Sequence, residues 1–427
     1  MVFSYTIGRL LDSSRFGGTG RKLILAAGIA GSAGLMLSVR FSDLILGSVL
    51  HAERYHWILP VGLSFYTLQI VAYLADVYKG RTTAETNLAR YALFISWFPQ
   101  IIQGPIPRYS SLRKDLFQGF DITFENITSA LRLCVWGFFL KLMIADKAGI
   151  FVDAVFQNPE GYAGLFFWIA AALNVIQTYC DFQGCVCISK GVSLLFGIHL
   201  PDNFRHPFRS LSSKEFWGRW HISFGIWLRD YIYFPLGGGK KGTVRKYLNL
   251  LAVFLVSGLW HGGSFQFLAW GILWVLFRIL EDSTESLQDT FFRKLGIPKG
   301  STVYNECKCG ILFLLLTLSV VMISARRFAD SLMIYRRMFT VWNLWIFPDG
   351  SLFRCGLEAK DWNVLLVSIL ILAFTERAND GRQPCSRLAS QAQTVRWLQC
   401  FLAVLVIILF GTYGDSFAAQ SFIYGGF

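Results

Sequence analysis

The fold of this chain is decided by one stretch, Leu248–Phe277, which reads LNLLAVFLVSGLWHGGSFQFLAWGILWVLF. These thirty residues include no Asp, Glu, Lys or Arg. Because a helix needs only about twenty residues to cross a bilayer, we expect two membrane helices that divide at Gly262–Gly263. At about 1.5 Å of rise per helical residue, His261 would lie about 22 Å from Lys246, deep in a hydrocarbon layer about 30 Å thick.

An imidazole at that depth loses hydration and must find a polar partner or a water-filled cavity. Ionisable groups inside a membrane are functional candidates, although a core histidine bonded to a neighbouring carbonyl is an equally good interpretation of this stretch alone. Gly258, Gly262 and Gly263 favour the functional interpretation, because they leave space around the His261 ring and permit a break in the helix.

The composition of the 427-residue chain is typical of a polytopic membrane protein. Hydrophobic residues make up 54% and charged residues 16%, with a mean hydropathy of +0.46, which is too apolar for a soluble domain of this length. Apolar runs recur from end to end. We therefore predict an all-α fold with a single membrane domain over residues 1–427.

The net charge of +13 is spread over short loops rather than gathered in a tail. This distribution favours contact with anionic membrane lipid and disfavours nucleic-acid binding. The basic loops Lys79–Arg81, Arg108–Lys114 and Lys240–Lys246 are candidates for the cytoplasmic side, because short cytoplasmic loops are enriched in Lys and Arg.

The nine cysteines indicate neither a disulfide framework nor a zinc site, since their number is odd and no CxxC pair occurs. The pairs Cys185/Cys187 and Cys307/Cys309 are weak metal hints that we discount, so no metal site is predicted. No signal peptide is expected either, because Met1 leads into a segment with Gly and Arg before the first long apolar run.

The apolar runs predict about nine to eleven membrane helices, with no internal repeat. The segment Ile127–Val155 includes Lys141 and Asp146, which should face protein or water. The expected spans are Leu23–Val39, Trp57–Tyr78, Tyr91–Ile106, Ile127–Val155, Tyr162–Cys180, Val186–His199, the two halves of Leu248–Phe277, Ile311–Ala325, Trp362–Phe374 and Trp397–Tyr413.

A second histidine, His221, lies in SSKEFWGRWHISFGIWLRDYIYFPLGGG. Ser212 and Glu215 have capping-box spacing, so a helix is expected to start there. At 3.6 residues per turn this segment has one aromatic stripe and one stripe of small and basic residues that includes His221. Such a helix lies in the membrane interface or caps a cavity. In the simpler interpretation His221, Arg219 and Arg229 face lipid phosphates, whereas the flanking glycines leave room beside the imidazole for a substrate.

The loop Gly237–Gly239 is followed by Lys240 and Lys241 and resembles a phosphate-binding loop. It lacks the strand and helix context of a nucleotide-binding P-loop. Nucleotide hydrolysis is therefore disfavoured.

Taken together, these motifs resemble the membrane-bound O-acyltransferases, above all the bacterial proteins that acetylate alginate and other polysaccharides. The teichoic-acid D-alanyl transferases are more distant. The similarity covers nearly the whole chain. The matching segments are PVGLSFYTLQIVAYLADVYKG (60–80), FPQIIQGPIPRY (98–109), YCDFQG (179–184), NFRHPFRSLSSKEFW (203–217), FWGRWHISFGIWLRDYIYFPLGGGKKG (216–242), SGLWHGGSFQFLAWG (257–271) and SFIYGGF (421–427).

The resemblance implies roles for individual residues. The family's catalytic histidine falls on His261, which follows Trp260 in the xWHG element, and its second histidine falls on His221. Arg229 and Asp230 match the family's RD pair, and Asp181 matches the aspartate of its CDF element. The sequence departs from the pattern at Gly218, where arginine is usual, and at Cys185–Cys187, where more polar residues are usual. The family's leading membrane helices are expected to be missing.

The resemblance also implies a reaction. A membrane enzyme of the bacterial plasma membrane would move an acyl group, here acetyl, from a cytoplasmic thioester to an extracytoplasmic polysaccharide, through a tunnel that meets at His261. The donor would be acyl-CoA or an acyl-carrier thioester, no cofactor would be bound, and a secreted SGNH-type partner would complete the transfer. Desolvation would keep His261 neutral and able to act as the base. From charge alone, we expect Arg219, Lys240 and Lys241 to attract the donor phosphates.

Three alternatives stay open from the sequence. D-alanyl transfer to teichoic acid would use the same site with another donor. A transporter or lipid flippase would also need buried ionisable groups, but it favours two related halves, which this sequence lacks. An inactive relative that serves as a membrane scaffold would fit the departure at Cys185–Cys187 and the expected absence of the leading helices.

Overall fold

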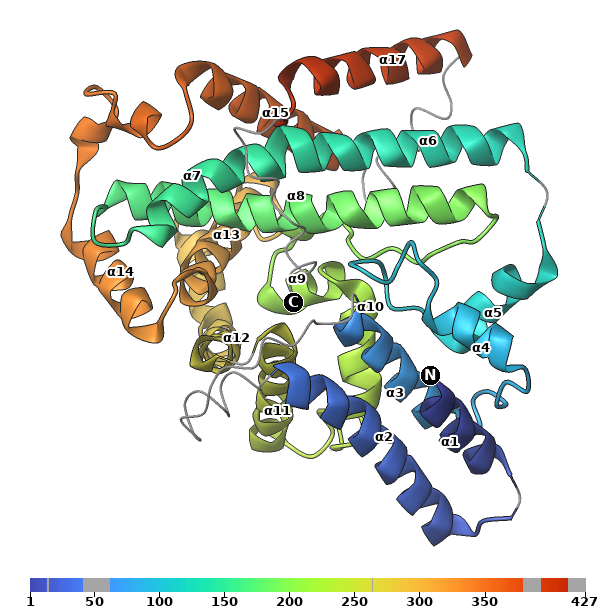
Figure 1. The fold of residues 1–427 in the computed structure, drawn as a ribbon. Coiled ribbons are helices and arrows are strands. Elements are labelled where there is room, and N and C mark those ends of the chain that lie inside the picture. The colour runs from blue at the N-terminus through green and yellow to red at the C-terminus, as the bar shows by residue number, and fades with distance from the viewer. Residues whose placement is uncertain (14, 41–61, 121, 263, 379–392, 414–427) are drawn as a thin grey trace, which may run out of the picture.

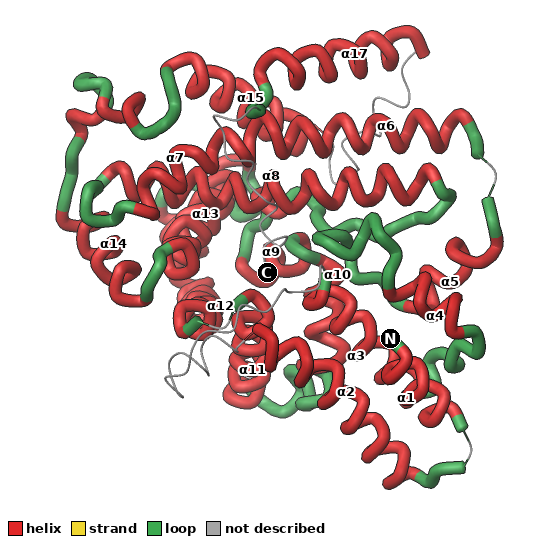
Figure 2. Tube along the Cα trace, viewed as in Figure 1, coloured by secondary structure: helices red, strands yellow, loops and turns green. Residues whose placement is uncertain are grey.

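The computed structural model describes residues 1–427 except 14, 41–61, 121, 263, 379–392 and 414–427. All regular elements in the described part are helical, as predicted (Figure 2). The longer helices are α1 (Val2–Asp12), α2 (Gly18–Arg40), α3 (Leu63–Tyr78), α4 (Leu88–Ile95), α5 (Tyr109–Gln118), α6 (Phe124–Phe138), α7 (Asp146–Gln157), α8 (Leu165–Leu195), α9 (Ser213–Arg219), α10 (Ile222–Leu228), α11 (Thr243–His261), α12 (Phe265–Lys294), α13 (Thr302–Ser324), α14 (Phe328–Thr340), α15 (Ala359–Ala378) and α17 (Gln393–Phe410).

Two long antiparallel rods form the centre of the molecule (Figure 1). The first is continuous from α6 through a π-helical turn, Phe139–Ala145, into α7, and the second is α8. They pack closely because glycines face each other: a Cβ on Gly137 would lie 2.6 Å from the Gly184 carbonyl oxygen, and one on Gly184 would lie 2.8 Å from the Gly137 oxygen. Small residues of this kind let membrane helices approach.

Five of the described helical segments are long and apolar enough to cross a membrane. Four of the predicted spans are confirmed closely by these segments, and the predicted Trp362–Phe374 run lies inside α15. Residues 57–61 of the span predicted at Trp57–Tyr78 and the C-terminal SFIYGGF lie outside the described residues. The five segments are Gly18–Ser38, Phe124–Gln157, Leu165–Leu195, Thr302–Ser324 and Gln393–Phe410.

The predicted span Tyr91–Ile106 is wrong. Helix α4 ends at Ile95, and the following residues form turns and irregular backbone up to α5. The physical reason is the proline content of FPQIIQGPIPRY, with prolines at 99, 105 and 107, because proline lacks the backbone N–H that a helix interior requires.

The two spans predicted at Tyr162–Cys180 and Val186–His199 are one helix, the 31-residue α8. The interruption that we expected between Cys180 and Val186 does not occur. Lys141 lies 2.6 Å from the Asp181 carboxylate, so the buried charge has a partner and the helix continues past it.

The break in Leu248–Phe277 is confirmed, although neither α11 nor α12 is among the five candidate membrane spans of the described residues. Helix α11 ends at His261, Gly262 has extended backbone, and α12 begins at Phe265. A Cβ on Gly258 would lie 2.4 Å from the Phe267 carbonyl oxygen, so glycine lets the two helices meet next to His261. The hairpin therefore fixes the place of this histidine from both sides.

The expected helix around His221 is only partly right. It starts as predicted, since the Ser212 side chain accepts a hydrogen bond from the Glu215 N–H and Glu215 accepts one from the Leu211 N–H. It then breaks: α9 ends at Arg219 and α10 begins at Ile222. The continuous aromatic and basic stripes of the sequence are thereby divided between two short helices.

Candidate active site

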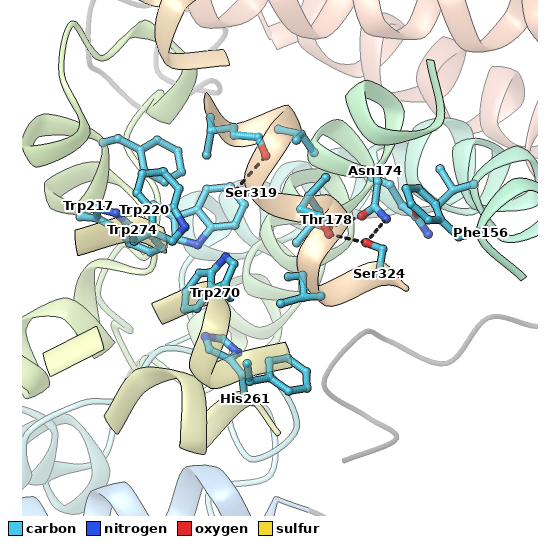
Figure 3. A pocket seen from close by; sticks show the side chains of 18 of the residues that line it. Phe156, Asn174, Thr178, Trp217, Trp220, His261, Trp270, Trp274, Ser319 and Ser324 are labelled. Atoms are coloured by element: carbon cyan, nitrogen blue, oxygen red, sulfur yellow. Dashed lines mark hydrogen bonds between the residues drawn. The ribbon is translucent and has the colours of Figure 1, made fainter. Parts of the chain in front are cut away.

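His261 lines a cavity of about 310 Å³, at the lower end of the range for small-molecule sites. The His261 ring lies 5.6 Å from the Trp270 ring and 4.9 Å from the Trp260 ring, centroid to centroid. Figure 3 shows His261 and Trp270 on one side of this cavity and a polar group of side chains across from them. The cavity lies between the middle of α8 and the end portions of α7, α9, α11, α12 and α13.

The walls of the His261 cavity differ in chemistry. Four tryptophans form an aromatic side, Trp217, Trp220, Trp270 and Trp274. On the polar side, Asn174 Nδ2 donates to Ser324 Oγ at 2.8 Å and Thr178 Oγ1 donates to Asn174 Oδ1 at 3.1 Å. Such a cavity can hold an apolar or flat group on one wall and bind hydroxyl groups on the other.

Sequence reasoning missed Asn174, Thr178 and Ser324. The available signal was that polar residues inside apolar membrane helices mark cavities. It was too weak to use alone, because Ser and Thr often bond their own helix backbone, as Ser324 also does by donating to the Val320 carbonyl at 2.8 Å.

His221 is buried, with 3% of its surface exposed, and precedes α10. Neither of its ring nitrogens has a hydrogen-bond partner among the described residues. Its φ of +45° lies in the left-handed region, which is costly for a residue other than glycine. An unsatisfied, strained and buried imidazole is unfavourable for stability alone, and such features gather at functional sites.

Hydrogen bonds to Asn203 hold this strained turn in place. The Ile222 N–H donates to the Asn203 carbonyl at 2.9 Å, and the Ser223 N–H and hydroxyl donate to Asn203 Oδ1 at 3.1 and 2.6 Å. Asn203 is itself fully buried. The backbone around His221 is therefore determined by its neighbours, and the ring is positioned without a bond of its own.

Trp260 connects the two histidines. Its ring centroid lies 4.9 Å from that of His261 and 5.9 Å from that of His221. Phe224 also contacts both, at 6.2 and 5.0 Å. The structure thus brings together three residues that the sequence singled out, His261, His221 and Trp260.

Asp181 lies behind His221 and not in the cavity. Its carboxylate accepts from Lys141 Nζ at 2.6 Å, and the same ammonium lies 2.8 Å from Asp146. The neighbouring Phe182 ring packs edge-on against the His221 ring, with 4.6 Å between centroids. Asp181 is thus part of a buried ion cluster that supports the helix on which Phe182 lies.

The RD pair lies at a polar edge away from the His261 cavity. Arg229 is exposed. The Asp230 carboxylate lies 2.6 Å from Arg108, which also pairs with Asp76 at 3.2 Å, and Lys79 Nζ donates to the Asp230 carbonyl at 3.4 Å. This ion network joins the basic loops near residues 79 and 108 to the segment before α11.

The structure does not bring the three expected phosphate-binding residues together. Lys240 and Lys241 are exposed in the turn that leads into α11. Arg219 instead lines a separate cavity of about 520 Å³, which we call the arginine cavity. Its lining consists of Arg205, His206, Arg209, Arg219, Thr302, Asn305, Glu306, Glu376 and Arg377.

The two cavities lie toward opposite ends of α13. Thr302, Asn305 and Glu306 from the start of this helix line the arginine cavity, whereas Leu316 to Ser324 at its end contribute to the His261 cavity. Sequence reasoning found only Arg219 of the arginine cavity. Arg205, His206 and Arg209 lie in the matching segment 203–217 but were given no role, and the other lining residues are far from them in the chain. Among the described residues, no group of three or more His, Cys, Asp or Glu suits a metal ion.

Comparison with known proteins identifies the family. Residues 82–304 match the family model described as MBOAT, membrane-bound O-acyltransferase family. The chain belongs to the membrane-bound O-acyltransferases. The predicted resemblance and the prediction of a membrane acyltransferase are therefore confirmed.

Curated relatives include proteins of several bacteria that are named as acetyl- or alanyltransferases. The chain is 32% identical to the probable alginate O-acetylase AlgI of Pseudomonas putida over 86% of its own length and 74% of the relative. It is 32% identical to the peptidoglycan O-acetyltransferase of Helicobacter pylori over 64% of its length and 58% of the relative. The teichoic acid D-alanyltransferase of Bacillus subtilis is more distant, at 27% identity over 52% of the chain and 58% of the relative.

Proposed function

We propose that this membrane-bound O-acyltransferase moves an acetyl group from a cytoplasmic thioester to a hydroxyl acceptor on the other side of the membrane, with His261 as the general base. The observation that supports this most strongly is the placement of His261 at the wall of a cavity, beside a second buried imidazole without a partner. A hydroxyl is a poor nucleophile, so a base positioned at the reacting oxygen is the catalytic requirement.

The reaction would proceed by addition and elimination. The acceptor oxygen attacks the thioester carbonyl carbon while a ring nitrogen of His261 takes the hydroxyl proton. The tetrahedral intermediate then expels the thiolate by breaking the C–S bond, and the imidazolium returns its proton to sulfur. The products are an ester and a thiol, and His261 is neutral again, so the atoms and charges balance.

His221 is proposed to take part in the same site by orienting one substrate or by sharing the proton. Its ring nitrogens are free of bonds within the described structure, so they are available to a ligand. Trp260 keeps the two imidazoles in fixed relative positions through its ring contacts.

The proposed direction of transfer is supported by the position of the basic loops. Helix α11 begins next to Lys240 and Lys241, α12 returns and places Asp282 2.7 Å from Lys246, and α13 then runs back toward the His261 cavity. If these basic residues are cytoplasmic, as the positive-inside rule favours, the His261 cavity opens away from the cytoplasm and the arginine cavity toward it. Exposed Lys240 and Lys241 would then attract an anionic donor at the cytoplasmic side, together with Arg219 and Arg229, whereas Asp230 serves there as the carboxylate partner of Arg108.

The acceptor is proposed to be a polysaccharide or cell-wall polymer, reached through an SGNH-type partner outside the membrane. The polar wall of Asn174, Thr178 and Ser324 offers hydrogen bonds to hydroxyl groups. The names of the more similar relatives, alginate O-acetylase and peptidoglycan O-acetyltransferase, favour acetyl transfer over D-alanyl transfer.

The test is transfer of labelled acetyl from acetyl-CoA by the purified protein in lipid nanodiscs, with polysaccharide and the SGNH-type partner as acceptor system. Covalent label on the acceptor is the expected result. Movement of the label across the bilayer without covalent transfer would instead indicate a transporter, and no reaction with acetyl-CoA but reaction with a D-alanyl carrier protein would indicate alanyl transfer.

A further inference from the structure

Helices α6 and α17 lie side by side and run in the same direction (Figure 1). The Phe124 ring at the start of α6 lies 6.5 Å from the Trp397 ring near the start of α17. Further along, the Thr412 N–H just beyond α17 donates to the Leu142 carbonyl in the continuation of α6, at 3.2 Å. The N-terminal ends of both helices therefore lie together, and so do the positive ends of their dipoles.

A narrow cavity of about 40 Å³, which we call the α6–α17 cavity, opens between these two helix starts. Residues of both helices line it, and the described lining includes one arginine from each helix and no carboxylate. A cavity of this volume holds about three water molecules or one small anionic group. Besides Phe124 and Trp397, the lining consists of Thr128, Leu131, Arg132, Gln393, Arg396 and Cys400.

Arg132 is a buried cation without a counterion in the described part of the chain. Only 9% of its surface is exposed, it has no ion pair with a described carboxylate, and its Nε has no hydrogen-bond partner. Its Nη2 donates to Ser129 Oγ at 2.9 Å, which is a neutral acceptor on the same helix. A buried guanidinium with an unpaired N–H is costly, so an anionic acceptor in the cavity would stabilise it.

Arg396 approaches the same cavity from the first turn of α17. It is half-buried, and its Nε also lacks a partner among the described residues. Helical side chains tilt toward the N-terminus, so Arg132 extends back toward the start of α6, where Arg396 lies. Two guanidinium groups that line so small a cavity repel each other, and an anion between them would remove this repulsion. Guanidinium groups beside helix N-termini are suited to a phosphate.

The surroundings of the α6–α17 cavity favour a lipid over a dissolved anion. Both helices belong to candidate membrane spans, and only 6% of the α17 span is buried inside the protein. Leu131 lines the cavity and is 43% exposed, and Phe401, one turn beyond Trp397 on α17, is also exposed. Arg132 lies eight residues after Phe124, about 12 Å along the helix, so its long side chain reaches back toward the polar surface of the membrane.

We propose that the α6–α17 cavity binds the phosphate of an anionic phospholipid between Arg132 and Arg396, with the acyl chains on the exposed apolar surface of α17. A dissolved phosphate ion has the same headgroup chemistry but would leave that apolar surface uncovered. The basic loop Arg108–Lys114 precedes α6 on the side that the positive-inside rule makes cytoplasmic, and anionic lipids are enriched in that leaflet. The site is independent of the proposed function, since neither arginine lines the His261 cavity.

The experiment titrates the full-length protein in detergent with phosphatidylglycerol or phosphatidylcholine and measures bound lipid by native mass spectrometry. We expect phosphatidylglycerol to bind the wild type more tightly than phosphatidylcholine does. Arg132→Gln and Arg396→Gln should each weaken phosphatidylglycerol binding about tenfold, because a charge-assisted bond is lost, and Arg132→Lys should keep part of it. Arg113→Gln, at an exposed arginine outside the cavity, is the matched control and should bind as the wild type does.

Thermal unfolding in nanodiscs separates lipid binding from a structural role of Arg132. Phosphatidylglycerol should raise the unfolding temperature of the wild type above its value in phosphatidylcholine, because a ligand that binds only the folded state stabilises it. It should not raise that of Arg132→Met. In phosphatidylcholine alone, Arg132→Met should be at least as stable as the wild type, because a buried charge without a counterion is removed.

Three outcomes would overturn the lipid site. The first is equal binding of the two lipids to the wild type, or unchanged phosphatidylglycerol binding in Arg132→Gln and Arg396→Gln. The second is competition by inorganic phosphate at the same concentration as the lipid, which would assign the cavity to a dissolved anion. The third is a less stable Arg132→Met in phosphatidylcholine that still gains the full stabilisation from phosphatidylglycerol, which would make Arg132 a structural residue. Binding and unfolding are read without acyl transfer, so an inactive protein would leave the lipid site standing.

Discussion

The His261 cavity and the arginine cavity share α13 and the Arg219–Trp220 corner, yet most of their lining differs in chemistry. The first has four tryptophans, a few hydroxyl and amide groups and the single carboxylate of Asp153, and two histidines lie at or behind its wall. The second has four arginines, two glutamates and the N-terminus of a long helix. Helix α13 therefore connects the arginine cavity, which is suited to binding an anion, with the His261 cavity, which is suited to a reaction of uncharged groups. The comparison suggests a division between holding the donor and activating the acceptor.

The largest effect on acetyl transfer is expected for a substitution in the His261 cavity. His261→Ala should lower acetyl transfer by about 10²- to 10⁴-fold, the usual contribution of a general base, while the protein stays folded in detergent. His199→Ala is the matched control, because this histidine is largely exposed and pairs with Asp115 on the surface. Measured turnover of labelled acetyl near the wild-type rate in His261→Ala would remove this residue from the mechanism.

The second prediction separates function from strain at His221. Glycine adopts the left-handed backbone without cost, which offsets part of the packing lost with the buried ring, so His221→Gly should stay folded and lose no more than about 1–3 kcal/mol of unfolding free energy. Its acetyl transfer should nevertheless fall severely. A variant with unchanged kcat and KM would show that His221 serves only to fill the space behind Trp260.

The third prediction concerns the helix hairpin that places His261. In Gly258→Val a Cβ would lie 2.4 Å from the Phe267 carbonyl oxygen, so α11 and α12 must separate. We expect a cost of about 1–3 kcal/mol in unfolding free energy, as in overpacked cores, and a loss of transfer because His261 moves. Gly310→Val, at a position with open space, is the control. Equal thermal stabilities of the two variants would contradict the close contact.

The smallest expected effect is a pH dependence of the arginine cavity. Glu376 lies beyond the apolar part of α15 and outside the candidate membrane spans, and burial raises its pKa to about 7. Below that pH the carboxyl is neutral and the cavity more positive, so coenzyme A should bind about two- to fivefold more tightly at pH 6 than at pH 8, a change of up to about 1 kcal/mol. The groups around Glu376 are Tyr179 from α8, His206 and Arg209 from the loop before α9, Glu306 from α13 and Arg377 on its own helix.

Protonation of the ligand phosphate would also act on binding in this pH range. Glu376→Gln isolates the contribution of the carboxyl: it should bind more tightly than the wild type at pH 8 and depend less on pH. A variant with the same pH profile as the wild type would show that Glu376 does not titrate next to the ligand.

The sequence predicted the features that depend on local pattern and on composition. The helical membrane fold, the break after His261 and the cap at Ser212 follow from apolar runs, glycines and capping spacing, and the structure has them. The prolines between Trp97 and Tyr109 were underweighted, which gave a span that does not exist. The single helix α8 was missed because the Lys141 partner of Asp181 comes from another helix.

The candidate site was likewise predicted only in part from the sequence. His261, His221 and Trp260 were found because they lie in two short motifs, and the structure places them around shared rings. The polar wall of Asn174 and Ser324 and most of the arginine cavity arise from residues far apart in the chain. Their proximity depends on how α8, α13 and α15 pack, and no spacing in the sequence encodes that.

The most direct test of the division between the two cavities is the dependence of acetyl transfer on acetyl-CoA concentration, measured in parallel for His261→Ala and Arg205→Gln. We predict that Arg205→Gln raises KM about tenfold and reaches nearly the wild-type kcat at saturation, whereas no concentration of donor restores transfer in His261→Ala. A normal kcat in His261→Ala, or a loss of kcat without a change of KM in Arg205→Gln, would contradict this account.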